Sequence, residues 1–299
     1  VIDKLYQLGA APSKGFWVGL LNQATRKGET ALMAASKAGH VATVRKLLEY
    51  GSDVNGTSIS GNTALHLACA KGLPQVAEVL IDGGAHVAMA AADGCTPLLR
   101  AATSTSTSTL KLLLTRLNQK DIDARDKEGF SALHLAAKTG KVGALTALLD
   151  HGMDVGMKRS GASNADGSET PLISAVRAGQ TDAVALLLGY KADVEQRTGG
   201  RTPLGWAASE GKMRVARLLV DIGGADLLAI DKKTGRVPRQ LAEACGHIQT
   251  SQLLSKMARG EWLQLRPEDQ CSQPSHEMAL AHVPPAPHIL RDRGNKEAW

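Results

Sequence analysis

Aromatic residues are scarce in this sequence of 299 residues: they make up 3% of it, although 43% of the residues are hydrophobic. The apolar interior must therefore be built mainly from alanine and leucine side chains. Such a core suits thin layers of closely packed short helices.

Cysteine is also rare, and the four cysteines show no Cys-x-x-Cys spacing and no paired histidine. This gives no indication of a metal site or of a disulfide framework. We expect Cys69 and Cys245 to be small core or near-core residues.

No apolar run approaches the roughly 18 residues of a membrane span, and no charged-then-apolar leader opens the chain. We therefore expect a soluble intracellular protein, cytoplasmic or alternatively nuclear.

A strong excess of one charge is missing as well. The formal net charge is +6, and it is spread along the chain rather than gathered in one stripe. A scattered basic balance is typical of a solvated surface, whereas nucleic-acid binding needs a clustered basic face. We expect no nucleic-acid partner.

One segment of the chain recurs throughout it. The residues Gly61-Asn62-Thr63-Ala64-Leu65-His66-Leu67-Ala68 return in varied form, with the threonine or serine at positions 30, 63, 96, 131, 170 and 202. The intervals are 33, 33, 35, 39 and 32 residues. A period of this length with the pattern Thr-Pro-Leu-His-x-Ala resembles ankyrin repeats. The resemblance implies an all-α repeat solenoid of about six to seven units, each a helix–turn–helix with a β-hairpin finger.

The repeats divide the chain into three parts. Residues 28–257 form the predicted ankyrin repeat domain, and its last copy is degenerate, with Arg239 in place of the inward leucine. A terminal unit must show water a polar face, which Arg239 suits. Residues 1–27 are either the remnant of an upstream repeat or an amphipathic cap. Residues 258–299 contain several prolines and are predicted to be a disordered tail.

Three departures from the repeat pattern carry expectations of their own. Serine and threonine alternate over residues 103–109, which predicts a lengthened, mobile loop between two helices because these residues favour turns over helix interiors. The polar insert 158–165 should project as a flexible finger. Trp206 stands where the second copy has Leu67, and we interpret it as an oversized core residue rather than an exposed anchor.

The histidines of the motif do not indicate chemistry. His66 and His134 match the family's Thr-x-Leu-His motif, whose histidine is understood as structural, and other copies have Met33 or Leu99 at the same position. No phosphate-binding glycine pattern and no nucleophile–base set stand out. We therefore expect no enzyme activity, no cofactor and no metal.

Asn55 allows two readings. The sequence around it resembles the consensus at which ankyrin asparagines are hydroxylated in animal proteins. The alternative, which we favour, is a finger asparagine that forms a hydrogen bond across the hairpin.

The resemblance implies a scaffold for protein–protein recognition, which binds its partners through the finger tips and the inner, concave helix face. Ile59 and Phe130 are predicted to be exposed apolar anchors, so that Phe130→Ala should weaken binding and leave unfolding nearly unchanged. The alternative is a targeting module of a larger enzyme, channel or ubiquitin-ligase adaptor. We expect a monomer whose partners are other proteins. The predicted finger contacts are Ile59, Ser60, Lys127, Glu128, Phe130, Lys158, Arg159, Arg197, Lys232, Lys233 and Arg236, and the inner-helix contacts are Ser36, Lys37, Lys71, Lys138, Arg177, Ser209 and Glu210.

Overall fold

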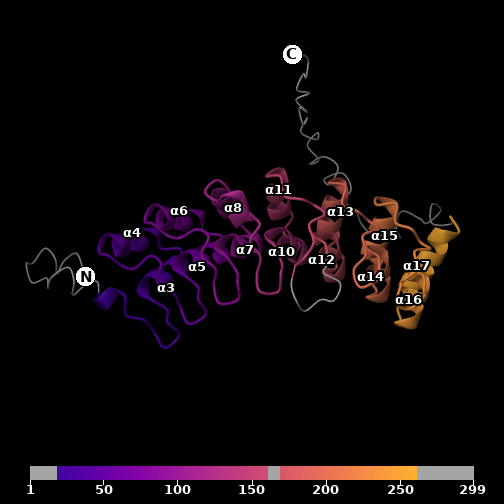
Figure 1. The fold of residues 1–299 in the computed structure, drawn as a ribbon, viewed down its shortest axis with the longest axis horizontal. Coiled ribbons are helices and arrows are strands. Elements are labelled where there is room, and N and C mark those ends of the chain that lie inside the picture. Colours follow the sequence, from indigo (N-terminus) through magenta and orange to yellow (C-terminus); the bar gives the residue numbers. More distant parts are fainter. Residues whose placement is uncertain (1–18, 161–168, 261–299) are drawn as a thin grey trace, which may run out of the picture.

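A computed structural model describes residues 19–160 and 169–260, and in it the chain forms a gently curved stack of helix pairs (Figure 1). Seven pairs follow one another, so the predicted all-α ankyrin solenoid is confirmed. The inner helices are α3 (Ala31–Ala38), α5 (Ala64–Lys71), α7 (Pro97–Ala102), α10 (Ala132–Thr139), α12 (Pro171–Ala178), α14 (Pro203–Ser209) and α16 (Pro238–Ala244). The outer helices are α4 (Val41–Glu49), α6 (Pro74–Asp82), α8 (Thr107–Leu114), α11 (Val142–Asp150), α13 (Thr181–Gly189), α15 (Met213–Asp221) and α17 (Ile248–Ala258), and α9 (Gln119–Ile122) is a short additional helix.

The repeated threonine or serine starts each inner helix. In six units its side chain accepts a hydrogen bond from the backbone N–H three residues later, which satisfies one of the donors that a helix start leaves unpaired. The seventh unit has Val237 instead, and there the Gln240 side chain accepts from the Val237 N–H at 3.2 Å. A glycine with left-handed backbone, such as Gly39 or Gly72, ends several of these helices. The outer helix then begins 11 positions after the capping residue in each unit.

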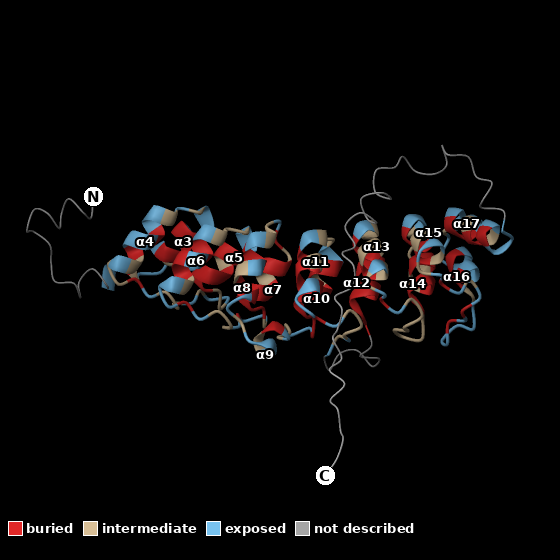
Figure 2. Ribbon diagram, turned by 90° about the horizontal axis from the view of Figure 1, so that it is seen from above, coloured by how far each residue is buried: buried red, intermediate tan, exposed pale blue. Residues whose placement is uncertain are grey.

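The core is one continuous cluster that runs along the stack between the two rows of helices (Figure 2). The leucine two positions after each cap, from Leu32 to Leu204, is almost completely buried. In the last unit the same position is Arg239, which is exposed. Ser251 and Ser255 take the positions that Val44 and Leu48 hold in the first unit. The stack therefore ends on a polar face, as a terminal repeat requires.

The fingers are linked by a repeated backbone hydrogen bond. The N–H of Ile59 donates to the carbonyl of Lys27 at 3.1 Å, and the N–H of Ala92 donates to that of Ser60 at 3.0 Å. The fingers are hairpin-shaped turns: in the described ranges there are isolated antiparallel bridges, Arg125 with Ser131 and Thr198 with Arg201, but no regular strand. The finger tips at Ile59 and Ala92 are thus tied to the preceding ones, and those at Lys127, Ser160 and Lys232 are tied in the same way.

The predicted long loop at residues 103–109 is wrong. Helix α8 starts at Thr107, the same 11 positions after Thr96 as in the other units, and Thr109 is buried at the position of Val76. Packing against the stack therefore overrides the turn preference of serine and threonine. The residues that lengthen this unit lie instead beyond α8, where α9 forms.

The two ends of the stack bear on further expectations. Leu21 is buried. Asn22 Oδ1 accepts a hydrogen bond from the Asp53 N–H, and Asn55 Oδ1 accepts the equivalent bond from the His86 N–H. Residues 19–27 therefore follow the register of a finger. The expectations for residues 1–18, for 161–165 of the insert and for the tail beyond residue 260 lie outside the described residues. Cys69 is buried as predicted, but Cys245, which caps the C-terminal end of α16, is exposed, so the prediction that it is a core or near-core residue is wrong.

Candidate functional site

The finger tips present most of the predicted contact residues to solvent. Among residues 19–160 and 169–260, Ile59 is the most exposed large apolar side chain, at 78%. Ser60, Lys127, Glu128, Lys158, Lys232, Lys233 and Arg236 are also exposed. The tips therefore combine lysine and arginine side chains with one prominent aliphatic group.

Phe130 does not belong to this exposed set. Only 4% of it is accessible, because its ring is covered by Arg159, whose guanidinium carbon lies 3.8 Å from the ring centroid. The Lys138 ammonium lies 4.8 Å from the same centroid, and the His134 ring meets Phe130 edge-on at 6.1 Å. The prediction that Phe130 is an exposed anchor is therefore wrong: the ring is part of the packing between units.

Arg159 is likewise committed to the scaffold. Its Nε donates to the Glu128 carbonyl at 2.7 Å, and its Nη1 lies 3.2 Å from Glu169 Oε2. Glu169 is 6% exposed and also accepts from Ser174 Oγ at 2.9 Å. A buried carboxylate is stable only when it is paired in this way. Arg159 thus ties the fourth unit to the fifth instead of projecting towards a partner.

Arg197 has a similar role near the end of the stack. Its Nη1 donates to the carbonyls of Gly200 at 3.1 Å and of Ile230 at 2.6 Å. Beside it, Arg201 donates from Nε and Nη2 to Asp231 Oδ2 at 3.0 and 2.8 Å. Burial opposes ionisation of Asp231, but the Lys233 amide and the Arg201 guanidinium outweigh it and lower the pKa of that carboxyl. These contacts fix the last finger against the preceding one.

Trp206 lies on the inner face and is half-buried. Arg177 and Arg201 flank its ring at 4.8 and 4.7 Å, and its Nε1 donates to the Thr198 carbonyl at 3.2 Å. Arg177 also pairs with Glu210 at 3.4 Å. The ring is therefore partly core and partly surface.

The other predicted inner-helix contacts divide into two groups. Lys37, Lys71 and Lys138 are exposed, whereas Ser36 is completely buried, so Ser36 was wrongly included. Ser209 is half-buried and is not part of either group: its Oγ accepts from Arg201 Nη1 at 3.0 Å and donates to the Trp206 carbonyl at 3.1 Å.

The motif histidines join neighbouring units. His134 Nδ1 lies 2.8 Å from Ser131 Oγ and its Nε2 lies 3.0 Å from the Glu169 carbonyl. His66 makes the same pair of contacts, to Thr63 at 2.9 Å and to the Cys95 carbonyl at 3.1 Å. Burial lowers the pKa of both rings, that of His134 to about 4. Each ring is a buried crosslink between a helix cap and the next unit.

Asn55 also spans two units. Its Oδ1 accepts from the His86 N–H at 2.8 Å, and its Nδ2 donates to the Gly84 carbonyl at 3.1 Å. The amide therefore reaches the next unit, rather than only crossing its own hairpin.

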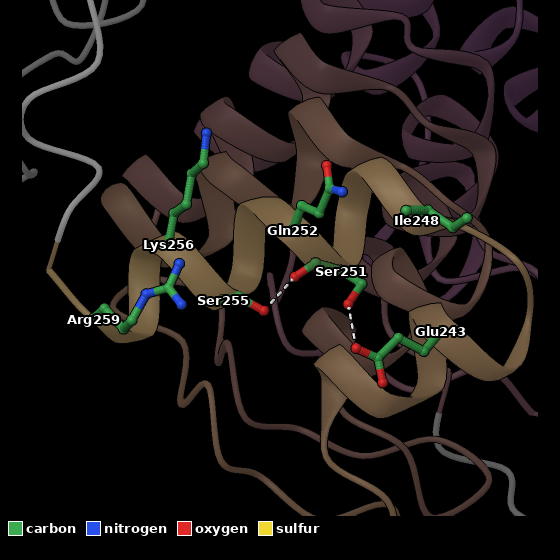
Figure 3. A pocket seen from close by; sticks show the side chains of 7 residues that line it. All are labelled: Glu243, Ile248, Ser251, Gln252, Ser255, Lys256 and Arg259. Carbon is green, nitrogen blue, oxygen red and sulfur yellow. Dashed lines mark hydrogen bonds between the residues drawn. The ribbon is translucent and has the colours of Figure 1, made fainter.

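A shallow hollow of about 400 Å³ lies at the end of the stack, between α16 and α17 (Figure 3). Two hydrogen bonds connect residues of its lining: Ser251 Oγ donates to Glu243 Oε1, and Ser255 Oγ donates to the Ser251 carbonyl, each at 2.9 Å. Over residues 19–160 and 169–260, no three potential metal ligands come together. No helix of the described part is long and apolar enough to cross a membrane.

Two exposed residues were missed by the sequence reasoning. Leu228 is 69% and Ile230 is 54% exposed, both on the last finger. They stand where an earlier finger has Asn55 and Thr57, since the N–H groups of Asn55 and Leu228 each donate to an aspartate Oδ1 two positions earlier. Counting from the helix caps misplaces both residues by one position, so the sequence held no clear signal for them.

Comparison with known proteins agrees with this architecture. The family model for ankyrin repeats (3 copies) matches residues 13–91, 84–159 and 158–231. The crystal structure of the human ASB11 ankyrin repeat domain is similar, with a TM-score of 0.65 and 27% sequence identity, over 76% of this chain and 96% of that one.

Curated relatives are longer proteins. The mouse B-cell lymphoma 3 protein homolog is 30% identical over 213 residues, which cover 69% of this chain and 46% of that protein. The human transient receptor potential cation channel subfamily A member 1 is 32% identical over 206 residues, 68% of this chain and 18% of the channel. This chain spans less than half the length of either relative. With family models matching most of its length, the chain belongs to the ankyrin repeat family.

Proposed function

We propose that this chain is a recognition scaffold that binds another protein through its finger tips and the inner faces of its helices. Ankyrin repeat domains generally mediate protein–protein interaction. The observation that carries the proposal here is the exposed row of tip residues, among them Ile59, Lys127, Lys158 and Lys232, on a stack whose units are fastened to one another. Enzymatic chemistry has no comparable support in the described residues.

The hydrogen bonds between units favour binding because they keep the surface rigid. His66, His134, Asn55 and Arg159 each connect one unit to the next through side-chain hydrogen bonds. A surface held in one conformation loses less conformational freedom on binding, which leaves more of the contact energy for affinity. The polar end of the stack, with Arg239 exposed, supports a monomer.

The alternative is that the same surface serves as the targeting module of a larger enzyme, channel or ubiquitin-ligase adaptor. The lengths of the relatives favour this version, since the channel extends far beyond the matched segment. An antibody against residues 28–257 decides between them. A band near 31.4 kDa on a denaturing gel of the natural source supports the scaffold, and a much larger band supports the module.

The recognition surface is tested by affinity capture from a cell lysate with matched charge reversals. Wild type is compared with a Lys127→Glu, Lys158→Glu variant at the tips and with Lys111→Glu on outer helix α8, where the lysine is also exposed. We expect a protein retained by wild type and by Lys111→Glu but lost from the tip variant. Equal retention by all three folded proteins would contradict recognition through these tips.

A further inference from the structure

The turns that join each inner helix to its outer helix lie side by side along one edge of the stack. A Cβ placed on Gly72 would lie 2.6 Å from Ser106 Cβ of the next turn, and one placed on Gly179 would lie 3.4 Å from Lys212 Cδ. Residues far apart in the sequence are therefore neighbours here. We call this line the turn edge and define it as the residues 7 to 12 positions after each cap: 37–42, 70–75, 103–108, 138–143, 177–182, 209–214 and 244–249.

The turn edge is basic. It carries seven lysine and arginine residues against two carboxylates, those of Asp182 and Glu210. The opposite ends of the outer helices, 19 to 23 positions after the caps of the first six units, have the reverse balance of seven carboxylates against two cations. The fold thus gathers into one row cations that are scattered in the sequence. They are Lys37, Lys71, Lys138, Lys141, Arg177, Lys212 and Arg214, of which Lys141 and Lys212 are half-buried and the others exposed.

Most of these cations have no carboxylate partner. Arg177 pairs with Glu210 at 3.4 Å and with Glu169 at 3.7 Å. Over residues 19–160 and 169–260, the other six cations of the row form no ion pair. The remaining carboxylate, Asp182, is exposed in the first turn of α13, where the helix dipole favours it. The folded protein therefore keeps an excess of positive charge along this edge.

Helix stability explains only part of the row. The cations in the last turns of α3, α5, α10 and α12 suit the negative end of the helix dipole. Lys141 and Lys212, however, cap the starts of α11 and α15, and Arg214 lies in the first turn of α15. The dipole disfavours cations at these positions. Three positive charges are thus present where they weaken their own helices, and an anionic ligand would offset that cost.

The turn edge also has little relief. Between the cations it consists largely of small residues, such as Ala38-Gly39, the serine and threonine residues of 103–108, and Ala178-Gly179. An extended chain can lie close to such a surface. Packed helices are about 8–10 Å apart, and an extended chain rises about 3.3 Å per residue. Every third residue of an extended segment would therefore reach the next turn.

We propose that the turn edge binds an extended acidic segment of another protein, with a carboxylate at about every third position facing successive turns. In the third unit, whose turn has no cation, the exposed hydroxyls of Thr105 and Ser108 are available to its backbone. Duplex DNA carries a charge about every 1.7 Å, which is far denser than this row, and the turn edge has no aromatic residue on which bases could stack. The inference rests on the proposed recognition function and names the chemistry of one partner.

The test measures the binding of two synthetic fluorescent peptides to the full chain by fluorescence anisotropy. Both peptides contain the same numbers of glutamate and serine residues. In the spaced peptide glutamate stands at every third position, and in the block peptide all glutamates are consecutive.

The key variant is Lys141→Glu, Arg214→Glu. It places carboxylates at the starts of two outer helices, where the dipole favours them, so its unfolding temperature should equal or exceed that of wild type. A loss of binding then cannot come from misfolding. The control, Arg45→Glu, Lys111→Glu, makes the same change of charge at exposed positions on outer helices α4 and α8.

We expect the spaced peptide to bind wild type more tightly than the block peptide does. It should bind the key variant about fivefold more weakly, as for the loss of two exposed ion pairs, and the control as it binds wild type. Its affinity should fall with added salt.

Several results would overturn the inference. Equal binding of the two peptides, or no binding, would refute the extended placement, and equal losses in the key and control variants would show only general attraction of charge. Binding that depends on Lys127 and Lys158 would place the segment at the finger tips and leave the proposed recognition function intact. Tighter binding of a DNA duplex than of the spaced peptide would assign the edge to nucleic acid. Self-association of the protein alone that Arg214→Glu abolishes would assign it to a second copy of this chain.

Discussion

The guanidinium of Arg159 lies over the ring of Phe130, with 3.8 Å between the guanidinium carbon and the ring centroid. The two residues come from neighbouring fingers: Phe130 stands directly before the longest interval between repeats, and Arg159 lies within that interval. Arg159 is further held by the Glu128 carbonyl and by Glu169. The pair therefore carries packing and charge across the point where the repeat pattern is least regular.

Replacement of Phe130 by alanine should destabilise the protein, because the ring is 4% exposed and supports three neighbouring side chains. We expect a loss of about 3 kcal/mol in the free energy of unfolding, within the usual range for a buried phenylalanine. Urea unfolding followed by circular dichroism measures it. Phe130→Leu, which keeps much of the volume, should cost less. An unchanged midpoint in Phe130→Ala would mean that the ring is exposed after all.

Leu133 provides the reference for a buried residue of the repeat consensus. It is completely buried, so Leu133→Ala should cost roughly 2–5 kcal/mol through lost burial and the cavity left behind. The same unfolding experiment applies. Met257→Leu is a mild comparison at another buried site, and it should change the midpoint little. A Leu133→Ala protein as stable as wild type would contradict the packing register.

The stability of the protein should fall as the pH is lowered from about 6.5 to about 4 because of His134. Burial lowers the pKa of this ring from 6.5 to about 4, so the unfolded chain takes up the proton at a higher pH than the folded one. The unfolded state then binds more protons in this window, and acid favours unfolding by up to about 3 kcal/mol. His134→Gln should show a flatter dependence of the unfolding free energy on pH between these values. Parallel curves for the two proteins would rule out this contribution.

Asn55 should contribute to the coupling between two units. Asn55→Ala removes both hydrogen bonds to the next unit, and we expect a loss of about 1 to 2 kcal/mol. Asn55→Asp keeps the acceptor for the His86 N–H and should lose less. Equal stability of all three proteins would contradict this role.

The same residue allows a test of the hydroxylation reading. Mass spectrometry of the Asn55 peptide isolated from cells should show no added oxygen. A peptide heavier by one oxygen would establish the modification.

The fold could be predicted from the sequence because the residues of the repeat motif determine the structure of their own unit. Thr63 caps a helix, Leu65 enters the core two positions later and Gly72 ends the helix. Each step depends on neighbours within the same unit, so the resemblance of the repeated motif to ankyrin repeats was enough to predict helix pairs, and the spacing of the motif gave their order. Exposed tips such as Ile59 and Lys127 followed from the same register.

The errors arose where a neighbour outside the unit decides the outcome. Phe130 stands one position before a cap, where Asn62 of another unit is half-exposed, and the Arg159 side chain from the next finger covers its ring. Thr109 is a poor helix former, but core packing places it at the position of Val76. Arg197 and Arg159 looked like free surface cations because their carbonyl partners belong to adjacent fingers. Repeat consensus holds no information on these cross-unit contacts.

Hydrogen exchange of the protein, alone and bound to the partner captured from lysate, tests the central claim most directly. Recognition through the fingers and inner helices predicts slower exchange at residues 57–60 and 126–129 and in inner helices α10 and α12, with outer helices α8 and α11 unchanged. Slower exchange confined to the outer helices, with the finger tips unaffected, would contradict it.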